Sequence, residues 1–187
     1  MFRIFGRMHR GISGFFYRWF ESWLPGLMAR FTFAAVLFFY FFNSAKLKVG
    51  DGLEGFFQVE LGAFAQMLPK AMEANGYDPS ALTKFPYHVF VYAGTYLEFV
   101  LPVLIIVGLL TRFAALGMIV FIVVQSYVDI AGHNAVAETV GVWFDRIPDA
   151  AILDQRLLWI FPLLYLVIYG AGRLSLDRFF TPRRREF

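Results

Sequence analysis

A run of apolar residues from 86 to 110 constrains the fold of this chain more than any other feature. A transmembrane helix needs about 20 apolar residues to cross a hydrocarbon core about 30 Å thick. Residues 27–45, 86–110 and 113–131 are long enough, and residues 157–172 are shorter but flanked by arginines that can extend to the two interfaces. The sequence therefore predicts an all-α, polytopic membrane protein with a bundle of four transmembrane helices.

The composition agrees with a membrane protein and excludes several kinds of site. Of 187 residues 59% are hydrophobic, 24 are Phe and only 17% are charged, whereas a soluble domain carries more charge and fewer aromatic residues. The absence of cysteine excludes disulfides, thiolate metal sites and iron–sulfur clusters held by Cys. Neither a metal-ligand spacing nor a nucleophile–base pair is visible, so we expect no metal site and no enzymatic activity of this chain on its own.

The positive charges predict the orientation. The formal net charge is +3, and basic residues gather at the two ends of the chain, which indicates membrane flanks rather than a nucleic-acid surface. Loops rich in Lys and Arg stay in the cytoplasm. We therefore predict a protein of the cell inner membrane, with both termini in the cytoplasm because the number of spans is even. Residues 47–85 and 133–155 then form the outer loops.

Three regions are expected. Residues 1–24 have apolar residues at helical spacing and several arginines, which favours an amphipathic helix lying in the interface, with a frayed basic extension as the alternative. Residues 25–180 form the membrane domain, and residues 181–187 form a basic cytoplasmic tail. Within the first outer loop, apolar residues at helical spacing predict one or two short amphipathic helices broken at Pro69.

Glu98 is an ionisable residue within an apolar span, which a helix that only anchors a protein in the membrane does not require. It lies at the midpoint of residues 86–110, where a charge costs about 2.5–3.5 kcal/mol on insertion scales. Pro102, four residues later, has no N–H to give to the Glu98 carbonyl. Because no cation is expected at this level, we predict that Glu98 faces the bundle interior as a neutral acid.

Other polar residues predict a path from the outer surface to Glu98. Gln125, Asp129 and His133 recur every four residues and share one helix face. The complete candidate set for a ligand pocket or proton path is Glu98, Tyr165, Gln125, Asp129, His133, Asn43, Lys46 and His88. Two alternatives stay open: the polar side chains join the helices through hydrogen bonds, or His88 and His133 hold a haem.

The chain resembles the DoxX family of small four-helix membrane proteins of prokaryotes. The resemblance covers residues 30–180 and rests on Glu98 followed by Gly108, Thr111, Arg112, Ala114 and Ala115, on LDQRLLW (153–159) and on GAGRLSLD (170–177). From the local sequence, Thr111 is expected to cap the third helix, and Ser175 and Asp177 to cap the end of the fourth. Arg112 and Asp177 are expected on one side of the membrane, where they can form an ion pair.

The resemblance implies a fold more firmly than a reaction. The family includes a subunit similar to one of a thiosulfate:quinone oxidoreductase, and most members have no assigned activity. We therefore predict a membrane subunit of a redox or respiratory assembly, with a quinone-like or proton-handling pocket around Glu98. The sequence assigns no cofactor, with a quinone as the candidate, and the lipid bilayer and other membrane subunits are the expected partners. The alternatives are a non-catalytic scaffold that binds other membrane proteins and a small transporter.

Overall fold

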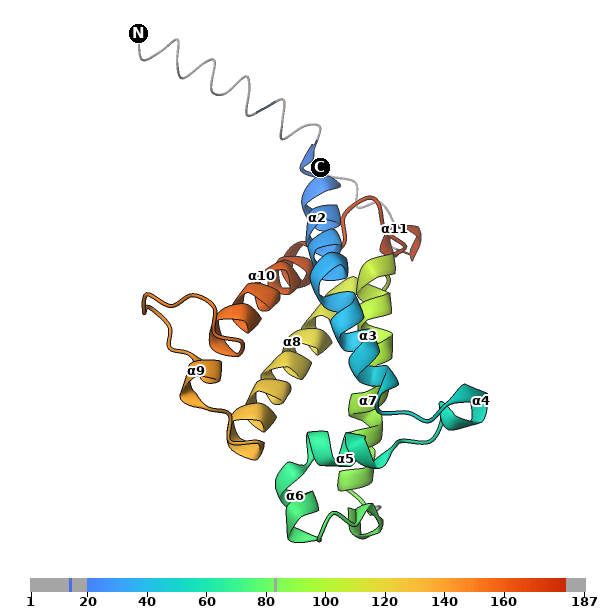
Figure 1. The fold of residues 1–187 in the computed structure, drawn as a ribbon. Helices are drawn as coiled ribbons and strands as arrows, with labels where there is room; N and C mark the ends of the chain where they lie inside the picture. Colours follow the sequence, from blue (N-terminus) through green and yellow to red (C-terminus); the bar gives the residue numbers. More distant parts are fainter. Residues whose placement is uncertain (1–13, 15–19, 83, 181–187) are drawn as a thin grey trace.

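The computed structural model describes residues 14, 20–82 and 84–180, and it consists of long helices joined by shorter ones (Figure 1). The first long helix runs through α2 (Leu24–Phe33), the π-helical η1 (Ala34–Phe38) and α3 (Phe39–Lys46). The other long helices are α7 (Tyr87–Val107), α8 (Thr111–Tyr127), which continues into the π-helical η3 (Val128–Gly132), and α10 (Leu153–Tyr169). The short helices are α4 (Gly52–Gly55), α5 (Leu61–Met67), α6 (Pro69–Ala74), η2 (Pro79–Leu82), α9 (Ala137–Val140) and α11 (Asp177–Phe180).

Among the described residues, 3 helical stretches are long and apolar enough to cross a membrane: Leu24–Lys46, Tyr87–Val107 and Thr111–Gly132. The prediction of an all-helical membrane protein is confirmed, since the described residues contain no strand beyond an isolated bridge between Val49 and Val59. The fourth span is not confirmed, because α10 has 17 residues. The predicted amphipathic helix at 1–24 and the tail at 181–187 fall almost entirely outside the described residues.

The fourth helix is shifted from its predicted position. It begins at Leu153 rather than at residue 157, and ends at Tyr169 rather than at residue 172. The predicted span left out Asp154 because it is polar. In the structure Asp154 lies in the first turn of the helix, where a negative charge is stabilising, and its carboxylate accepts a hydrogen bond from the preceding Ala150 N–H at 3.0 Å. Gly170, with φ of +80°, ends the helix.

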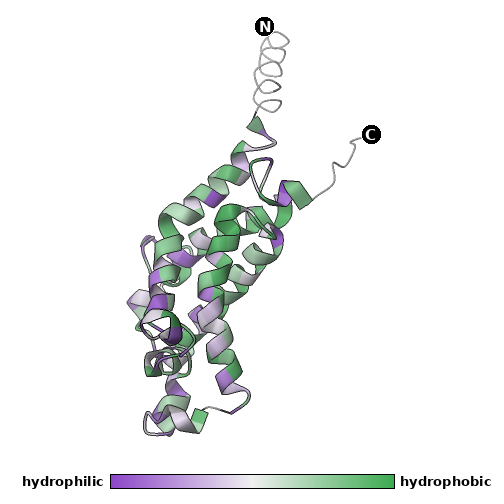
Figure 2. Ribbon diagram, turned by 90° about the vertical axis from the view of Figure 1, so that its right-hand side faces the viewer, coloured by the Kyte–Doolittle hydropathy of each residue, from purple (hydrophilic) through white to green (hydrophobic). Residues whose placement is uncertain are grey.

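The long helices pack in a fixed order. α8 packs against α7 and α10, α10 also packs against α2, and α3 packs against α7 (Figure 1). The side chains between them are fully buried, including Phe33, Phe41, Ile105, Met118 and Leu163. Many exposed side chains on the same helices are also apolar. Green, the colour of hydrophobic residues, covers much of the long helices in Figure 2. Apolar side chains on both faces are expected where lipid surrounds a bundle.

The turn between α7 and α8 is held by Asp177. Its carboxylate accepts hydrogen bonds from the N–H groups of Leu110, at 2.6 Å, and Thr111, at 3.0 Å. The prediction that Thr111 caps this helix is therefore wrong. Thr111 is the first residue of α8, and its buried hydroxyl has no hydrogen-bond partner among the described residues. Asp177 caps α8 instead of ending α10, because the segment after α10 folds back onto the turn.

Arg30 joins the same end of the bundle to the first helix. Its buried side chain donates to the Ile106 carbonyl at 2.9 Å and to the Leu174 carbonyl. Ser175 donates locally to the Gly172 carbonyl at 2.7 Å. Arg112 is exposed beside Gly170, and its predicted ion pair with Asp177 stays a prediction.

The first outer loop closes the other end of the bundle. The predicted break at Pro69 is confirmed, since α5 and α6 are separated at Leu68–Pro69. The loop holds more short helices than the one or two predicted, because α4 and η2 also lie in it. A Cβ atom added at Gly94 of α7 would lie 2.9 Å from the Met67 sulfur, and one added at Gly132 would lie 2.8 Å from Pro69. Both glycines thus let this loop contact α7 and η3 closely.

Candidate functional site

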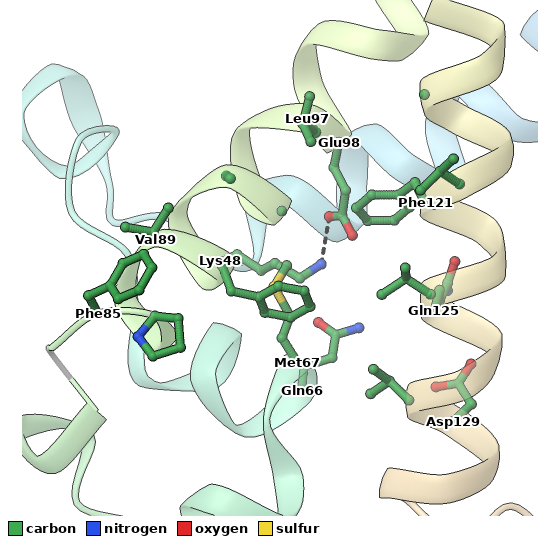
Figure 3. Close-up of a pocket in the computed structure, with 18 residues that line it drawn as sticks. Lys48, Gln66, Met67, Phe85, Val89, Leu97, Glu98, Phe121, Gln125 and Asp129 are labelled. Carbon is green, nitrogen blue, oxygen red and sulfur yellow. Dashed lines mark hydrogen bonds and ion pairs between the residues drawn. The ribbon is translucent and has the colours of Figure 1, made fainter.

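A buried ion pair lies half-way along α7. The Lys48 Nζ atom is 2.6 Å from the Glu98 Oε2 atom, and the two side chains are 2% and 6% exposed (Figure 3). Lys48 also donates to the Ser44 hydroxyl at 2.7 Å and the Ser44 carbonyl at 3.3 Å, so its side chain folds back along α3. The prediction that Glu98 faces the interior is confirmed by its burial. The expectation that no cation lies at the level of Glu98 is wrong, because this chain supplies Lys48. That Glu98 is neutral stays a prediction.

Lys46 was predicted to belong to the site, whereas in the structure Lys48 is the lysine that pairs with Glu98. Lys46 ends α3, is exposed, and holds its ammonium 5.0 Å from the centre of the Phe42 ring. The Phe42 and Phe99 rings lie 5.4 Å apart, so α3 ends at the level of Glu98 rather than at the level where α7 begins. The sequence spacing could have indicated Lys48, because it follows Ser44 by four residues and so lies on the same face of a helical chain.

A cavity of about 490 Å³ lies beside the ion pair, between α7 and α8. Its wall is mainly apolar, and α7 and α8 contribute Leu97 and Phe121 among others (Figure 3). The third side is formed by α5 through Gln66 and Met67. The polar side chains in the wall are Lys48, Gln66, Glu98, Gln125 and Asp129. The cavity thus combines a large apolar volume with a few polar groups, an arrangement typical of small-molecule sites.

A second ion pair borders the cavity. Asp129 pairs with Arg156, which also donates to the Ser126 hydroxyl at 2.9 Å. Arg156 is 7% exposed and lies 5.9 Å from the Trp159 ring centre. The prediction that Arg156 extends to the interface is wrong. It lies in the first turn of α10, where its side chain turns inward to meet Asp129.

Gln125 lies in the cavity wall between the two ion pairs. Its amide nitrogen donates to the Tyr40 hydroxyl at 2.9 Å, and its buried amide oxygen has no partner in the part of the chain that the structure describes. His133 follows further outward, where its Nε2 atom lies 2.9 Å from the Gln66 carbonyl. Of the residues of the predicted polar path, Glu98, Gln125 and Asp129 line this cavity, and His133 contacts Gln66 in its wall. The path itself stays a prediction.

The other candidate residues lie away from the cavity. Asn43 is exposed on α3, and His88 stacks on Tyr92 with ring centres 4.1 Å apart. Tyr165 stacks on Tyr169, with ring centres 4.8 Å apart, and is not among the residues that line the cavity. The shift of α10 explains this error, because a residue central to 157–172 lies near the inner end of Leu153–Tyr169. Pro102 is buried within α7, one turn from Glu98.

The described residues offer no group of three or more His, Asp or Glu side chains that could hold a metal ion. Outside the membrane-spanning segments, hydrogen bonds from the Ser80 side chain and N–H lower the pKa of Asp78. That carboxyl lies in the outer loop and takes no part in the cavity.

Together these features define an integral membrane protein whose apolar helices enclose a cavity beside a buried ion pair. The DoxX family model matches residues 25–128, more than half of the chain, and the protein belongs to the DoxX family. The matched region contains Lys48, Glu98 and Gln125 and ends just before Asp129. No curated protein and no solved structure matches the chain.

Proposed function

We propose that this DoxX-family protein binds a quinone-type molecule in the cavity between α7 and α8, as the membrane subunit of a redox assembly. One observation carries the proposal: an apolar cavity of about 490 Å³ has a buried ion pair, Lys48–Glu98, in its wall. A cavity of this size is within the range of small-molecule sites, about 300–1,000 Å³. Burying an ion pair costs desolvation free energy that can exceed the attraction between the charges, so the pair is weak evidence for a purely stabilising role.

The polar groups suit a quinone head. The carbonyl oxygens of a quinone accept hydrogen bonds, and the Lys48 ammonium can donate one. Its longest hydrogen bond, 3.3 Å to the Ser44 carbonyl, is the one that a ligand oxygen would replace. The Gln66 and Gln125 amides provide further donors in the same wall. Glu98, next to the head, would take up or release a proton as the redox state of the ligand changes.

The membrane arrangement is part of the same proposal. We place the protein in the cell inner membrane with both termini in the cytoplasm and α10 as a fourth span. With 17 residues, α10 is about 26 Å long, which is short for a hydrocarbon core of about 30 Å. Local thinning of the bilayer accommodates a helix of this length at modest cost. Partner subunits would exchange electrons with the bound molecule.

A proton path is the second candidate function. Glu98, Gln125 and Asp129 line one cavity, and Asp129 leads on to Arg156, which donates to Ser126. Intramembrane ionisable residues in series are typical of proton relays. The two functions share Glu98 and differ in whether an organic molecule fills the cavity.

Quinone content tests the first candidate. The protein is purified in a mild detergent from quinone-containing membranes, extracted with organic solvent, and its quinone is quantified by mass spectrometry. We expect about one quinone molecule per chain, and its loss in the double variant Lys48→Met/Glu98→Leu, which removes both charges together. The matched control Lys70→Met/Glu73→Leu, on the exposed face of α6, should retain the quinone. A quinone-free protein that also binds no added quinone would contradict the proposal.

A further inference from the structure

We infer that the ligand enters sideways from the bilayer, between α7 and α8, and that its tail stays in this opening. The ligand is then a membrane-dissolved molecule with a carbonyl-bearing head and a long prenyl or alkyl tail. This inference rests on the proposed function and adds the entry route and the class of tail.

The exposed residues of the cavity wall mark the opening. On α7 and α8, every exposed residue that lines the cavity is apolar: Val89, Phe90, Ala93, Leu97, Val120 and Val124. They come from the two helices that face each other across the cavity. An opening to water would carry polar side chains at its rim, whereas an opening to lipid requires apolar ones.

The other sides of the cavity are bordered by protein, and the exposed polar residue on them is Gln66 of α5. One end of the cavity lies toward the turn at residues 108–110 that joins α7 and α8. Figure 1 shows the two helices separating away from that turn, toward α5 and α6. There α5 lies between them, with Met67 close against Gly94 and Pro69 close against Gly132. On a further side, α3 packs along α7 and brings Lys48 to Glu98. The remaining side is the apolar rim.

The head and tail separate along this route. The ion pair is buried and lies on the inner wall, while the apolar rim is about half exposed, with Val120 at 55% and Val89 at 54%. A polar head bound at Lys48 therefore directs its tail past the rim. A long isoprenoid tail exceeds a cavity of about 490 Å³ that already holds the ring, so most of the tail has to extend into the lipid.

Val120 and Val123 provide a matched test of the opening. Both lie on α8 and both are 55% exposed, but only Val120 lines the cavity. Each is replaced by tryptophan, and the purified full-length proteins are placed in phospholipid nanodiscs. Dissociation constants are measured for two probes, a ubiquinone with a long isoprenoid tail and the same dimethoxy-methyl-benzoquinone head without a tail.

We expect the wild type to bind the tailed quinone at least about tenfold more tightly than the head alone. Val120→Trp should weaken binding of the tailed quinone by about tenfold and leave binding of the head within about twofold. Val123→Trp should change neither constant. Equal affinity for both probes in the wild type, or equal effects of the two tryptophans, would overturn the sideways route while the proposed function stands. If the wild type binds neither probe, the proposed function fails and this inference fails with it.

Discussion

Replacing Glu98 with glutamine takes the negative charge away from an ammonium that is buried 2.6 Å from it. Breaking a buried ion pair by removing one partner costs about 3–5 kcal/mol, because the other charge stays in a medium that solvates it poorly. Both side chains are at most 6% exposed, so solvent screening does not reduce this cost. Lys48 keeps its two contacts with Ser44, and the new amide oxygen can still accept a hydrogen bond. We therefore expect Glu98→Gln to lower the free energy of unfolding by about 3 kcal/mol, the low end of that range.

The double variant Lys48→Met/Glu98→Leu separates charge from packing. With both charges gone and similar volumes in place, the stability should lie within about 1 kcal/mol of the wild type, or above it. The free energies of unfolding are measured by titration with sodium dodecyl sulfate in mixed micelles, followed by circular dichroism. A cost of about 3 kcal/mol corresponds to a change of about 150-fold in the unfolding equilibrium, which this assay resolves.

One outcome would refute the reasoning. If Glu98→Gln unfolds within about 1 kcal/mol of the wild type, the carboxyl group makes no ion pair, and the neutral acid expected from the sequence is the correct description. A large cost that persists undiminished in the double variant would show that the loss comes from packing and not from charge.

Three further predictions concern the ends of the bundle and its orientation. Asp177→Ala should lower the free energy of unfolding by about 1–2 kcal/mol, because two N–H groups at the start of α8 lose their acceptor; an unchanged value in the same titration would show that water replaces the cap. Asp129→Asn should cost about 1–2 kcal/mol, because Arg156 loses its counter-charge while the Asp129 side chain, 31% exposed, is partly screened by water. An unchanged free energy of unfolding would contradict the ion pair. Cysteines introduced singly at Ser80 and Ala151, exposed residues of the two outer loops, should react with a membrane-impermeant maleimide in intact cells, while Arg178→Cys should not. Reaction at position 178 alone would reverse the proposed orientation.

The fold class followed from the sequence because lipid imposes a simple rule. Every backbone polar group in the hydrocarbon has to be satisfied within the chain, so long apolar runs form helices. The ends of the helices were harder to predict, because Asp154 and Arg156 resemble the polar residues that flank a membrane span. In the folded chain both are satisfied by local or interhelical partners and belong to α10. That shift moved Tyr165 away from the cavity.

The site was predictable only where one residue carried the signal. Glu98 stood out because a carboxylate in an apolar run is costly. Its partner did not, because Lys48 lies just beyond an apolar helix, among residues that look like a loop. Only the packing of α3 against α7, visible in the contact of Phe42 with Phe99, brings that ammonium to the carboxylate. Asp177 is a similar case, since its role depends on a chain reversal after α10.

Photolabelling tests the central claim most directly. Membranes that contain the full-length protein are irradiated with a photoreactive quinone, with and without an excess of unlabelled quinone, and the labelled peptides are identified by mass spectrometry. If the quinone site is the cavity beside Lys48 and Glu98, the label should fall on the segments 85–98 and 117–129. It should disappear with competitor and in the double variant Lys48→Met/Glu98→Leu. Label that competitor does not remove, or that falls instead on the groove between α2 and α10 near Thr32 and Trp159, would contradict the account.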